Sequence, residues 1–234
     1  MAGEFKPASE IPAAERKREW LRYYSPKRIH EQLLEVRMLA GLPIASVLEI
    51  GPYLGLVTAM LDNAGFEVTT MDMIAPSFER PKRPHIEMDL TEIEPKRLEG
   101  FDCILCCATL EHLPFEAAAA ALRAFHASCV PYVLISVPYQ GTQAFFQAYL
   151  NRYLFRQHFS FKKLRFLRTF HPEPSAGGHG HKWEIGYKGR ALKDFERLLT
   201  EIGFTIRRRE FSYPSYCVFH LLERRGPGGP DEPD

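Results

Sequence analysis

The stretch Ser46-Val47-Leu48-Glu49-Ile50-Gly51-Pro52-Tyr53-Leu54-Gly55 decides the fold class of this chain. An apolar run ends in Glu49 and a glycine turn, and a helical pattern follows over residues 56–61. A second apolar run over residues 66–71 ends at Asp72. Strand, glycine turn, helix, strand and acid is the layout of a nucleotide-binding crevice in a parallel α/β sheet. In that layout the turn brings backbone close to the ligand, and the acid accepts hydrogen bonds from ribose hydroxyls.

The glycine spacing limits which nucleotide this turn can hold. A dinucleotide turn reads G-x-G-x-x-G, but Tyr53 stands at its second glycine and Leu56 at its third. The G-K-[ST] sequence of a phosphate-binding loop is also absent from the chain. What remains is E-x-G-x-x-x-G, formed by Glu49, Gly51 and Gly55. It resembles the first motif of class I S-adenosylmethionine-dependent methyltransferases, E/D-x-G-x-G-x-G, with tyrosine in place of the middle glycine.

Further motifs follow in the order that this family has. Residues 85–90 are expected to form a short third strand, 101–107 a buried fourth strand and 132–138 a fifth. The string F-D-x-I-x-x-x-x-x-L-E-H-L-P, which contains the fourth strand, is similar to the fourth motif of small-molecule methyltransferases. The resemblance covers residues 28–140 well and residues 190–225 more loosely. It implies an α/β fold, with a Rossmann-like, doubly wound, mostly parallel sheet of seven strands.

The resemblance also implies a set of residues that bind S-adenosylmethionine. These are Glu49, Gly51, Tyr53, Gly55, Asp72, Met73, Asp89, Leu90, Cys107 and Thr109. The turn residues lie beside the methionine moiety. Asp72 holds the ribose hydroxyls, Met73 packs on the adenine and residues 89–90 line the adenine edge. Cys107 and Thr109 sit beside the sulfonium.

Composition fits one α/β domain and does not favour nucleic acid or a membrane as a partner. The chain has 234 residues, of which 45% are hydrophobic, and a net charge of +1. This balance creates no global field for nucleic acid or membrane. The five cysteines do not form two C-x-x-C pairs, as a zinc site of that type requires, so we interpret them as small buried hydrophobic residues in a reducing compartment. Without a signal-peptide pattern or a run long enough to span a bilayer, the expected location is cytoplasmic.

The expected domain organisation is a single methyltransferase domain over residues 13–225. Residues 1–12 and the Gly- and Pro-rich tail at residues 226–234 are expected to be disordered. Residues 139–190 exceed what a strand-to-helix connection needs. Because the insertion leaves from the carboxyl end of the fifth strand, where such sheets bind ligands, we expect a helical cap or lid over the crevice.

The composition of this insertion leaves its role open. No Asp or Glu occurs between residues 117 and 172, where arginines and lysines alternate with phenylalanines and tyrosines. Phe145, Phe146, Tyr149 and Tyr153 fall at helical spacing and predict one apolar helix face. The aromatic residues could simply form the core of the cap. With the cations they also suit an anionic or aromatic acceptor, a membrane surface, or single-stranded nucleic acid. For an anionic acceptor, the arginines expected to face the crevice are Arg152, Arg156 and Arg165.

Methyl transfer to oxygen needs a base near the methyl group. His112 follows the fourth strand, and its unperturbed pKa suits a base near neutrality, although a role in capping or packing the next helix is the favoured explanation. In the run from Gly177 to Gly186, glycines surround histidines, and His181 with Glu184 forms a second candidate base and its orienting carboxylate. An H-x-H pair with His179 could hold a metal, with Glu184 or His171 as a third ligand. An ordered loop without a chemical role also explains this run, and a mobile lid is favoured over a metal site.

These observations predict an S-adenosylmethionine-dependent methyltransferase that acts on a small, anionic or aromatic acceptor, with oxygen favoured slightly over nitrogen. Its catalytic candidates are His181, His112 and Glu184. One rival is a non-catalytic binding protein with this fold, which the substitution at Tyr53 favours. The other is an RNA methyltransferase, against which the near-neutral charge and the lack of a separate RNA-binding domain argue. The sequence gives no strong nucleic-acid signal and no transmembrane segment, but leaves peripheral membrane contact through the cap open.

Overall fold

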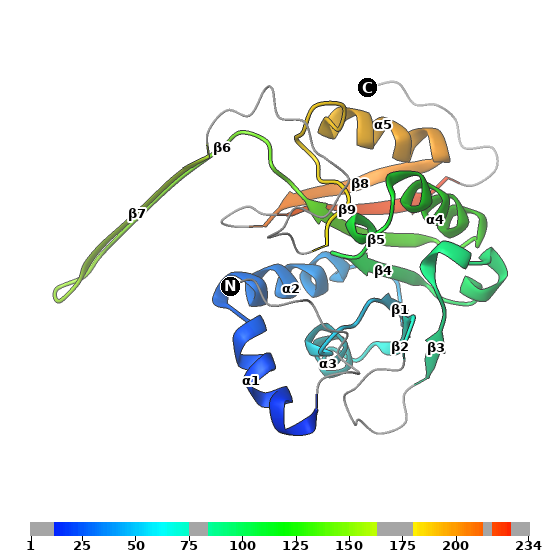
Figure 1. Ribbon diagram of the computed structural model, residues 1–234, viewed down its shortest axis with the longest axis horizontal. Helices are drawn as coiled ribbons and strands as arrows, with labels where there is room; N and C mark the ends of the chain where they lie inside the picture. Colours follow the sequence, from blue (N-terminus) through cyan, green and yellow to red (C-terminus); the bar gives the residue numbers. More distant parts are fainter. Residues whose placement is uncertain (1–11, 75–83, 163–179, 213–216, 226–234) are drawn as a thin grey trace.

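The computed structural model describes residues 12–74, 84–162, 180–212 and 217–225 (Figure 1). It contains a seven-stranded sheet in the order β3-β2-β1-β4-β5-β9-β8. Neighbouring strands are parallel except where β9 pairs antiparallel with β5 and β8. The expected doubly wound sheet is therefore confirmed. Its strands are β1 (Ser46–Ile50), β2 (Glu67–Asp72), β3 (His85–Glu87), β4 (Cys103–Cys107), β5 (Tyr132–Pro138), β8 (Phe204–Phe211) and β9 (Cys217–Arg224).

The helices begin and end where local chemistry predicts. Ser25 caps α2 by accepting a hydrogen bond from the N–H of Arg28, with Pro26 at the first helical position. Gly203 ends α5 with φ +113°, a conformation that favours glycine. No helix in the described part of the chain has the length and apolar character that crossing a membrane requires. The helices are α1 (Ala13–Tyr23), α2 (Pro26–Leu39), α3 (Leu56–Asn63), α4 (Phe115–Ala127) and α5 (Leu192–Ile202), with 3-10 turns η2 (Leu90–Glu92), η3 (Pro95–Leu98) and η4 (Leu110–His112).

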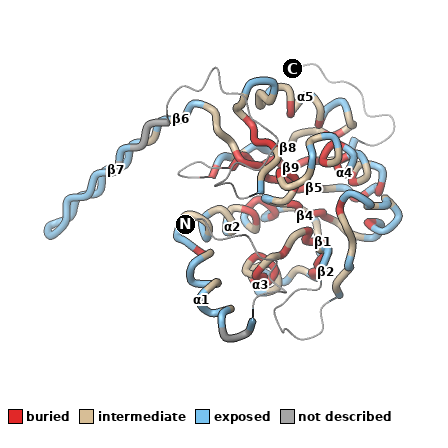
Figure 2. The backbone as a smooth tube through the Cα atoms, in the orientation of Figure 1, coloured by how far each residue is buried: buried red, intermediate tan, exposed pale blue. Residues whose placement is uncertain are grey.

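Side chains alternate between the two faces of the buried strands. In β4, Ile104 and Cys106 pack into the core under α4 and α5, whereas Cys103 and Leu105 pack into the core under α2 and α3. This period of two is what a strand buried on both faces requires. Figure 2 shows the resulting buried layer along the sheet, with exposed residues on the outer sides of the helices. The cysteines follow the prediction only in part, because Cys103, Cys106 and Cys217 are buried but Cys129 is exposed.

The insertion after β5 is not a helical cap in its described part, so that expectation was wrong. Residues Gln143–Leu150 form β6 and Phe155–Lys162 form β7, which pair antiparallel as a separate two-stranded ribbon. The ribbon extends away from the body and does not cover the ends of the parallel strands (Figure 1). Arg152 and Arg156 are exposed on this ribbon, a placement that does not support their predicted contact with the acceptor. Arg165, His171 and His179 lie outside the described residues.

The aromatic spacing that suggested a helix also fits a strand. Phe145, Tyr149 and Tyr153 are four residues apart, and four is close to one helical turn but is also a multiple of the strand period of two. The turn decides between them, because Asn151 accepts hydrogen bonds from the N–H groups of Tyr153 and Leu154, each at 2.8 Å. Asparagine side chains stabilise tight turns in this way. The chain therefore reverses at Asn151 rather than continuing as a helix.

A test of the helix ends concerns Cys129, which follows α4 with φ +64°. A side chain in this left-handed region is strained, so Cys129→Gly should raise the free energy of unfolding by about 0.5–1 kcal/mol. Urea unfolding of both proteins measures the difference. Cys129→Ala, which keeps a Cβ, is the control. An equal gain in the alanine variant would show that loss of the thiol, rather than relief of backbone strain, is responsible.

Candidate active site

The turn between β1 and α3 has left-handed backbone at three residues. Gly51 has φ +75°, Tyr53 has φ +45°, and Gly55, the N-cap of α3, has φ +74°. Glycine adopts this conformation freely, whereas for tyrosine it costs about 1–2 kcal/mol. Tyr53 therefore keeps the glycine-like backbone at the position where the sequence departs from the motif.

The ends of β1 and β4 meet at Gly51. The Gly51 N–H donates to the carbonyl of Met71 in β2 at 2.9 Å. A Cβ on Gly51 would lie only 2.6 Å from Oγ1 of Thr109, the second residue after β4. The Thr109 hydroxyl donates to the carbonyl of Cys107 at 3.0 Å. Only glycine permits this approach, which brings Gly51, Cys107 and Thr109 together at one point of the sheet.

Two buried carboxylates lie behind this point. Oε2 of Glu49 accepts a hydrogen bond from Oγ1 of Thr58 at 2.6 Å, which ties β1 to α3. Glu35 of α2 is buried as well, at 8% exposure. Burial, together with the negative charge of Glu49, raises the pKa of Glu35 well above its ordinary value. Two buried acidic side chains are thus close together on the α2 side of the strand ends.

The predicted adenosine-binding residues lie at the carboxyl ends of β2 and β3. Asp72 is the last residue of β2; its Oδ1 accepts from the N–H of Met73 at 2.7 Å, and burial raises its pKa. Met73 is 60% exposed beside it. Oδ1 of Asp89 accepts from the N–H of Thr91, so this carboxylate caps the turn η2. Leu90 is buried in the core, so a ligand could contact its backbone but not its side chain.

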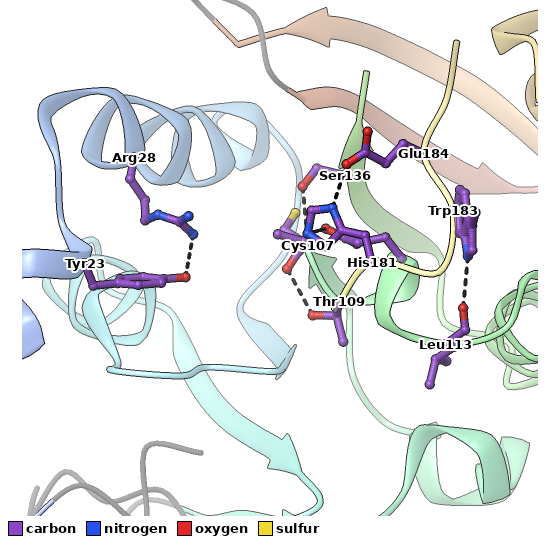
Figure 3. A network of polar contacts seen from close by, with 11 residues as sticks. Tyr23, Arg28, Cys107, Thr109, Leu113, Ser136, His181, Trp183 and Glu184 are labelled. Carbon is purple, nitrogen blue, oxygen red and sulfur yellow. Dashed lines mark hydrogen bonds and ion pairs between the residues drawn. The ribbon is translucent and has the colours of Figure 1, made fainter. Parts of the chain in front are cut away.

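Aromatic side chains from the N-terminal helices cover the β1–α3 turn. The ring centroids of Tyr23 and Tyr53 are 4.4 Å apart, and the hydroxyl of Tyr24 accepts from the N–H of Leu56 at 3.4 Å. Arg28 donates to the hydroxyl of Tyr23 at 2.6 Å. Figure 3 shows Tyr23 and Arg28 opposite His181, on the other side of Cys107 and Thr109. Sequence reasoning missed Arg28, since nothing in its local pattern marks it.

The segment that returns from the insertion lies against the end of β5. The N–H of Ile185 donates to the carbonyl of Pro138 at 2.9 Å, and the N–H of Lys182 donates to the carbonyl of Glu111 at 2.7 Å. The indole N–H of Trp183 donates to the carbonyl of Leu113 at 3.1 Å (Figure 3). These bonds fix residues 181–185 against the loop that follows β4, so His181 is not on a freely moving lid.

The three predicted catalytic side chains meet at this place, together with Glu111. Nδ1 of His181 lies 2.8 Å from Oε1 of Glu184, and Nε2 of His181 lies 3.9 Å from Oε1 of Glu111. The ring centroids of His112 and His181 are 5.1 Å apart. A carboxylate can only accept a hydrogen bond, so Glu184 holds the proton of a neutral imidazole on Nδ1 and leaves the lone pair on Nε2. The pair Glu184–His181 thus has the geometry of an oriented base.

Glu111 is the side chain of this cluster that the sequence did not reveal. It stands in the L-E-H-L-P string, but no residue type around it indicates that it would be buried, at 1% exposure. Burial raises the pKa of Glu111 to about 7, although the nearby His181 opposes the shift. One of its oxygens, Oε2, has no hydrogen-bond partner among the described residues. Such a carboxylate in a buried site is typical of a functional position.

The sequence can be assigned to a family on comparison with known proteins. The family described as a methyltransferase domain matches residues 13–173. The chain belongs to this methyltransferase-domain family. No curated protein sequence matches it.

Solved structures share the fold of this methyltransferase domain at low sequence identity. The 1,6-didemethyltoxoflavin-N1-methyltransferase of Burkholderia thailandensis, solved with S-adenosylhomocysteine, has 18% identity and a TM-score of 0.52, over 97% of this chain and 94% of that chain. The magnesium protoporphyrin IX methyltransferase of Synechocystis PCC 6803 has 16% identity and a TM-score of 0.56, over 93% and 98%. The N-methyltransferase NodS of Bradyrhizobium japonicum has 15% identity and a TM-score of 0.55, over 93% and 100%.

The pKa of Glu35 gives a test of the buried charge in this methyltransferase domain. Because the pKa of Glu35 in the folded chain lies above its ordinary value of 4.5, its favourable contribution to stability is complete below about pH 4.5 and is lost as pH rises toward the folded pKa. Glu35→Gln should therefore become more stable relative to the unmodified chain by about 1.4 kcal/mol per pH unit in that window. Urea unfolding at pH 5 and pH 8 measures this, and Glu99→Gln on an exposed site controls for net charge. A stability difference that does not change with pH would contradict the burial argument.

Proposed function

We propose that the chain transfers the methyl group of S-adenosylmethionine to a small acceptor, with oxygen favoured over nitrogen. The observation that carries this proposal is the meeting of Gly51, Thr109 and the Glu184–His181 pair at the carboxyl ends of β1, β4 and β5. The β1–α3 turn, which is assigned to the methyl donor, therefore lies close to a histidine that is oriented to act as a base toward an acceptor. Membership of the methyltransferase-domain family supports the reaction class.

The three methyltransferase structures compared above contain S-adenosylhomocysteine, which supports the choice of cofactor. Within this chain, Glu49, Gly51, Tyr53 and Gly55 are assigned to the methionine side of the site. Asp72, at the end of β2, is assigned to the ribose hydroxyls, and Met73, Asp89 and the backbone of Leu90 to the adenine. Cys107 and Thr109 lie between the residues assigned to the methionine side and those assigned to the adenosine side, and this point is assigned to the sulfonium.

The chemistry divides between the bound donor and the chain. S-adenosylmethionine, when held by the residues assigned above, would supply an electrophilic methyl carbon to the acceptor oxygen, and the electrons of the broken carbon–sulfur bond would stay on sulfur. Nε2 of His181 takes the acceptor proton, because Glu184 fixes the ring with the other nitrogen protonated. His112 packs beside the His181 ring and narrows the space for the acceptor. Proximity of donor and acceptor supplies the remaining rate enhancement.

Acceptor recognition is assigned to Arg28 and Tyr23 rather than to the ribbon. The guanidinium of Arg28 lies 4.0 Å from the centroid of the Tyr23 ring, and both residues are part-buried opposite His181 (Figure 3). A partly buried cation beside an aromatic face suits an acceptor that is anionic or aromatic. The acceptor class is therefore the one inferred from composition, but the residues assigned to recognise it are Arg28 and Tyr23 instead of the arginines of the insertion.

Asp72→Ala should weaken binding of S-adenosylhomocysteine at least tenfold. Hydrogen bonds to a charged acceptor contribute about 1.5–3 kcal/mol each, and the ribose offers two donors. Calorimetric titration of the full chain measures the affinity without any acceptor. Glu67→Ala, at the opposite end of the same strand, is the matched control and should bind normally. If the unmodified chain fails to bind the ligand, it is a non-catalytic protein with this fold. If Asp72→Ala binds as tightly as the unmodified chain, the ribose site lies elsewhere.

His181→Ala should lower turnover roughly 10²–10⁴-fold while leaving affinity for S-adenosylhomocysteine unchanged. The chain is incubated with S-adenosylmethionine and each member of a panel of small hydroxylated, anionic and aromatic compounds. Formation of S-adenosylhomocysteine identifies a working acceptor for the assay. Glu184→Gln should lower turnover less and shift its pH profile, since the ring loses its orienting carboxylate. His30→Ala on the exposed side of α2 serves as the control. Normal turnover in His181→Ala would remove this residue from the chemistry.

A further inference from the structure

The cluster of Glu111, His112 and His181 has a property that base catalysis alone does not use. One ligand atom from each side chain, a carboxylate oxygen or an imidazole nitrogen, lies within 4.8 Å of the other two. The residues come from two segments far apart in sequence. Glu111 and His112 belong to the turn after β4, and His181 returns from the insertion to join them.

We infer that Glu111, His112 and His181 form a binding site for a divalent transition-metal ion. Atoms bound to one ion at about 2.1 Å lie at most about 4.2 Å apart. The 3.9 Å between Nε2 of His181 and Oε1 of Glu111 already meets this limit, and the rest of the cluster needs to close by less than about 1 Å.

A second observation points to a missing partner at the same place. Oε2 of Glu111 is buried and has no hydrogen-bond partner among the described residues, although the whole residue is only 1% exposed. A buried carboxylate oxygen normally pairs with a donor, a water or an ion. An ion held by Glu111 and the two histidines would supply that partner.

The surroundings of His181 also match those of a metal ligand. Histidines that bind metals commonly direct the other ring nitrogen to a carboxylate, which fixes the tautomer and the orientation of the ring. Glu184 takes this position at 2.8 Å from Nδ1, so Nε2 faces Glu111. Glu184 is therefore a positioning residue in this account, acting through His181.

The donor set indicates the class of ion. Two imidazole nitrogens and one carboxylate suit Zn²⁺, Fe²⁺ or Co²⁺, whereas Mg²⁺ and Ca²⁺ prefer sites composed of oxygen. Three protein ligands leave coordination positions for water or for an acceptor hydroxyl. The role of the ion, though not its binding, rests on the proposed methyl transfer. The ion would polarise the acceptor hydroxyl and lower its pKa, so that the proton passes to solvent water, and His181 would then hold the ion instead of accepting the proton itself. Such an acceptor must present an oxygen, which deepens the preference for O-methylation.

Cobalt is a suitable probe because its visible absorption reports its ligands. The full-length chain is freed of metal with a chelator and titrated with Co²⁺ alone, and the absorbance gives stoichiometry and affinity. We expect one ion per chain without a thiolate charge-transfer band. Glu111→Gln and His181→Gln should each weaken binding at least about 100-fold, and Glu184→Gln about 10–100-fold. His30→Gln, on an exposed histidine of α2, should leave the affinity unchanged.

The wild-type titration decides the outcome even where a variant fails to fold. Absence of Co²⁺ binding to the unmodified chain, binding that Glu111→Gln leaves intact, or a charge-transfer band showing thiolate ligands would each overturn the inference. Affinity for S-adenosylhomocysteine is measured on the same samples. A chain that binds Co²⁺ but no S-adenosylhomocysteine supports the metal site while refuting the methyl transfer. A chain that binds S-adenosylhomocysteine but no Co²⁺ refutes the metal site while supporting the proposed methyl transfer.

Discussion

The close approach of β1 and β4 is the constraint on which the site depends. From β1 the chain moves outward through β2 to β3 and then returns to place β4 on the other side of β1, so the two strand ends diverge into separate connections. Ligands bind at such switch points because the connections leave space between them. Here the two strand ends come this close because Gly51 has no Cβ to meet Oγ1 of Thr109. Every proposed ligand contact is arranged around this pair.

Buried acidic side chains surround the same point. Glu35 and Glu49 lie on the α2 side, and Glu111 lies beyond β4, each with less than a tenth of its surface exposed. Burial of a carboxylate disfavours its charged form, as the raised pKa values of Glu35 and Glu111 reflect. Positive charge brought into this region would offset that cost. A sulfonium donor and a divalent ion both bring such charge, so the two proposals draw on one electrostatic feature of the fold.

The sequence was informative wherever local rules determine the structure. Strand alternation, the capping Ser25 and the stop at Gly203 fixed the elements, and glycine spacing placed the β1–α3 turn. It failed at residues 143–162, because aromatic spacing of four fits a helix and a strand equally and the turn at Asn151 went unrecognised. His112, His181 and Glu184 could be named from their residue types. Their meeting with Glu111, and the position of Arg28 opposite them, result from pairing between distant segments, which no local pattern encodes.

The central claim is that the methyl donor and the Glu184–His181 pair face one another across a single acceptor atom. A crystal structure of the full chain with S-adenosylhomocysteine tests it through the distance from the ligand sulfur to Nε2 of His181. An acceptor atom about 3 Å from the methyl carbon and within hydrogen-bond reach of His181 predicts roughly 6–8 Å for this distance. The ligand sulfur should also lie beside Thr109. A distance well beyond about 10 Å, or a ligand bound away from the ends of β1 and β4, would contradict the account.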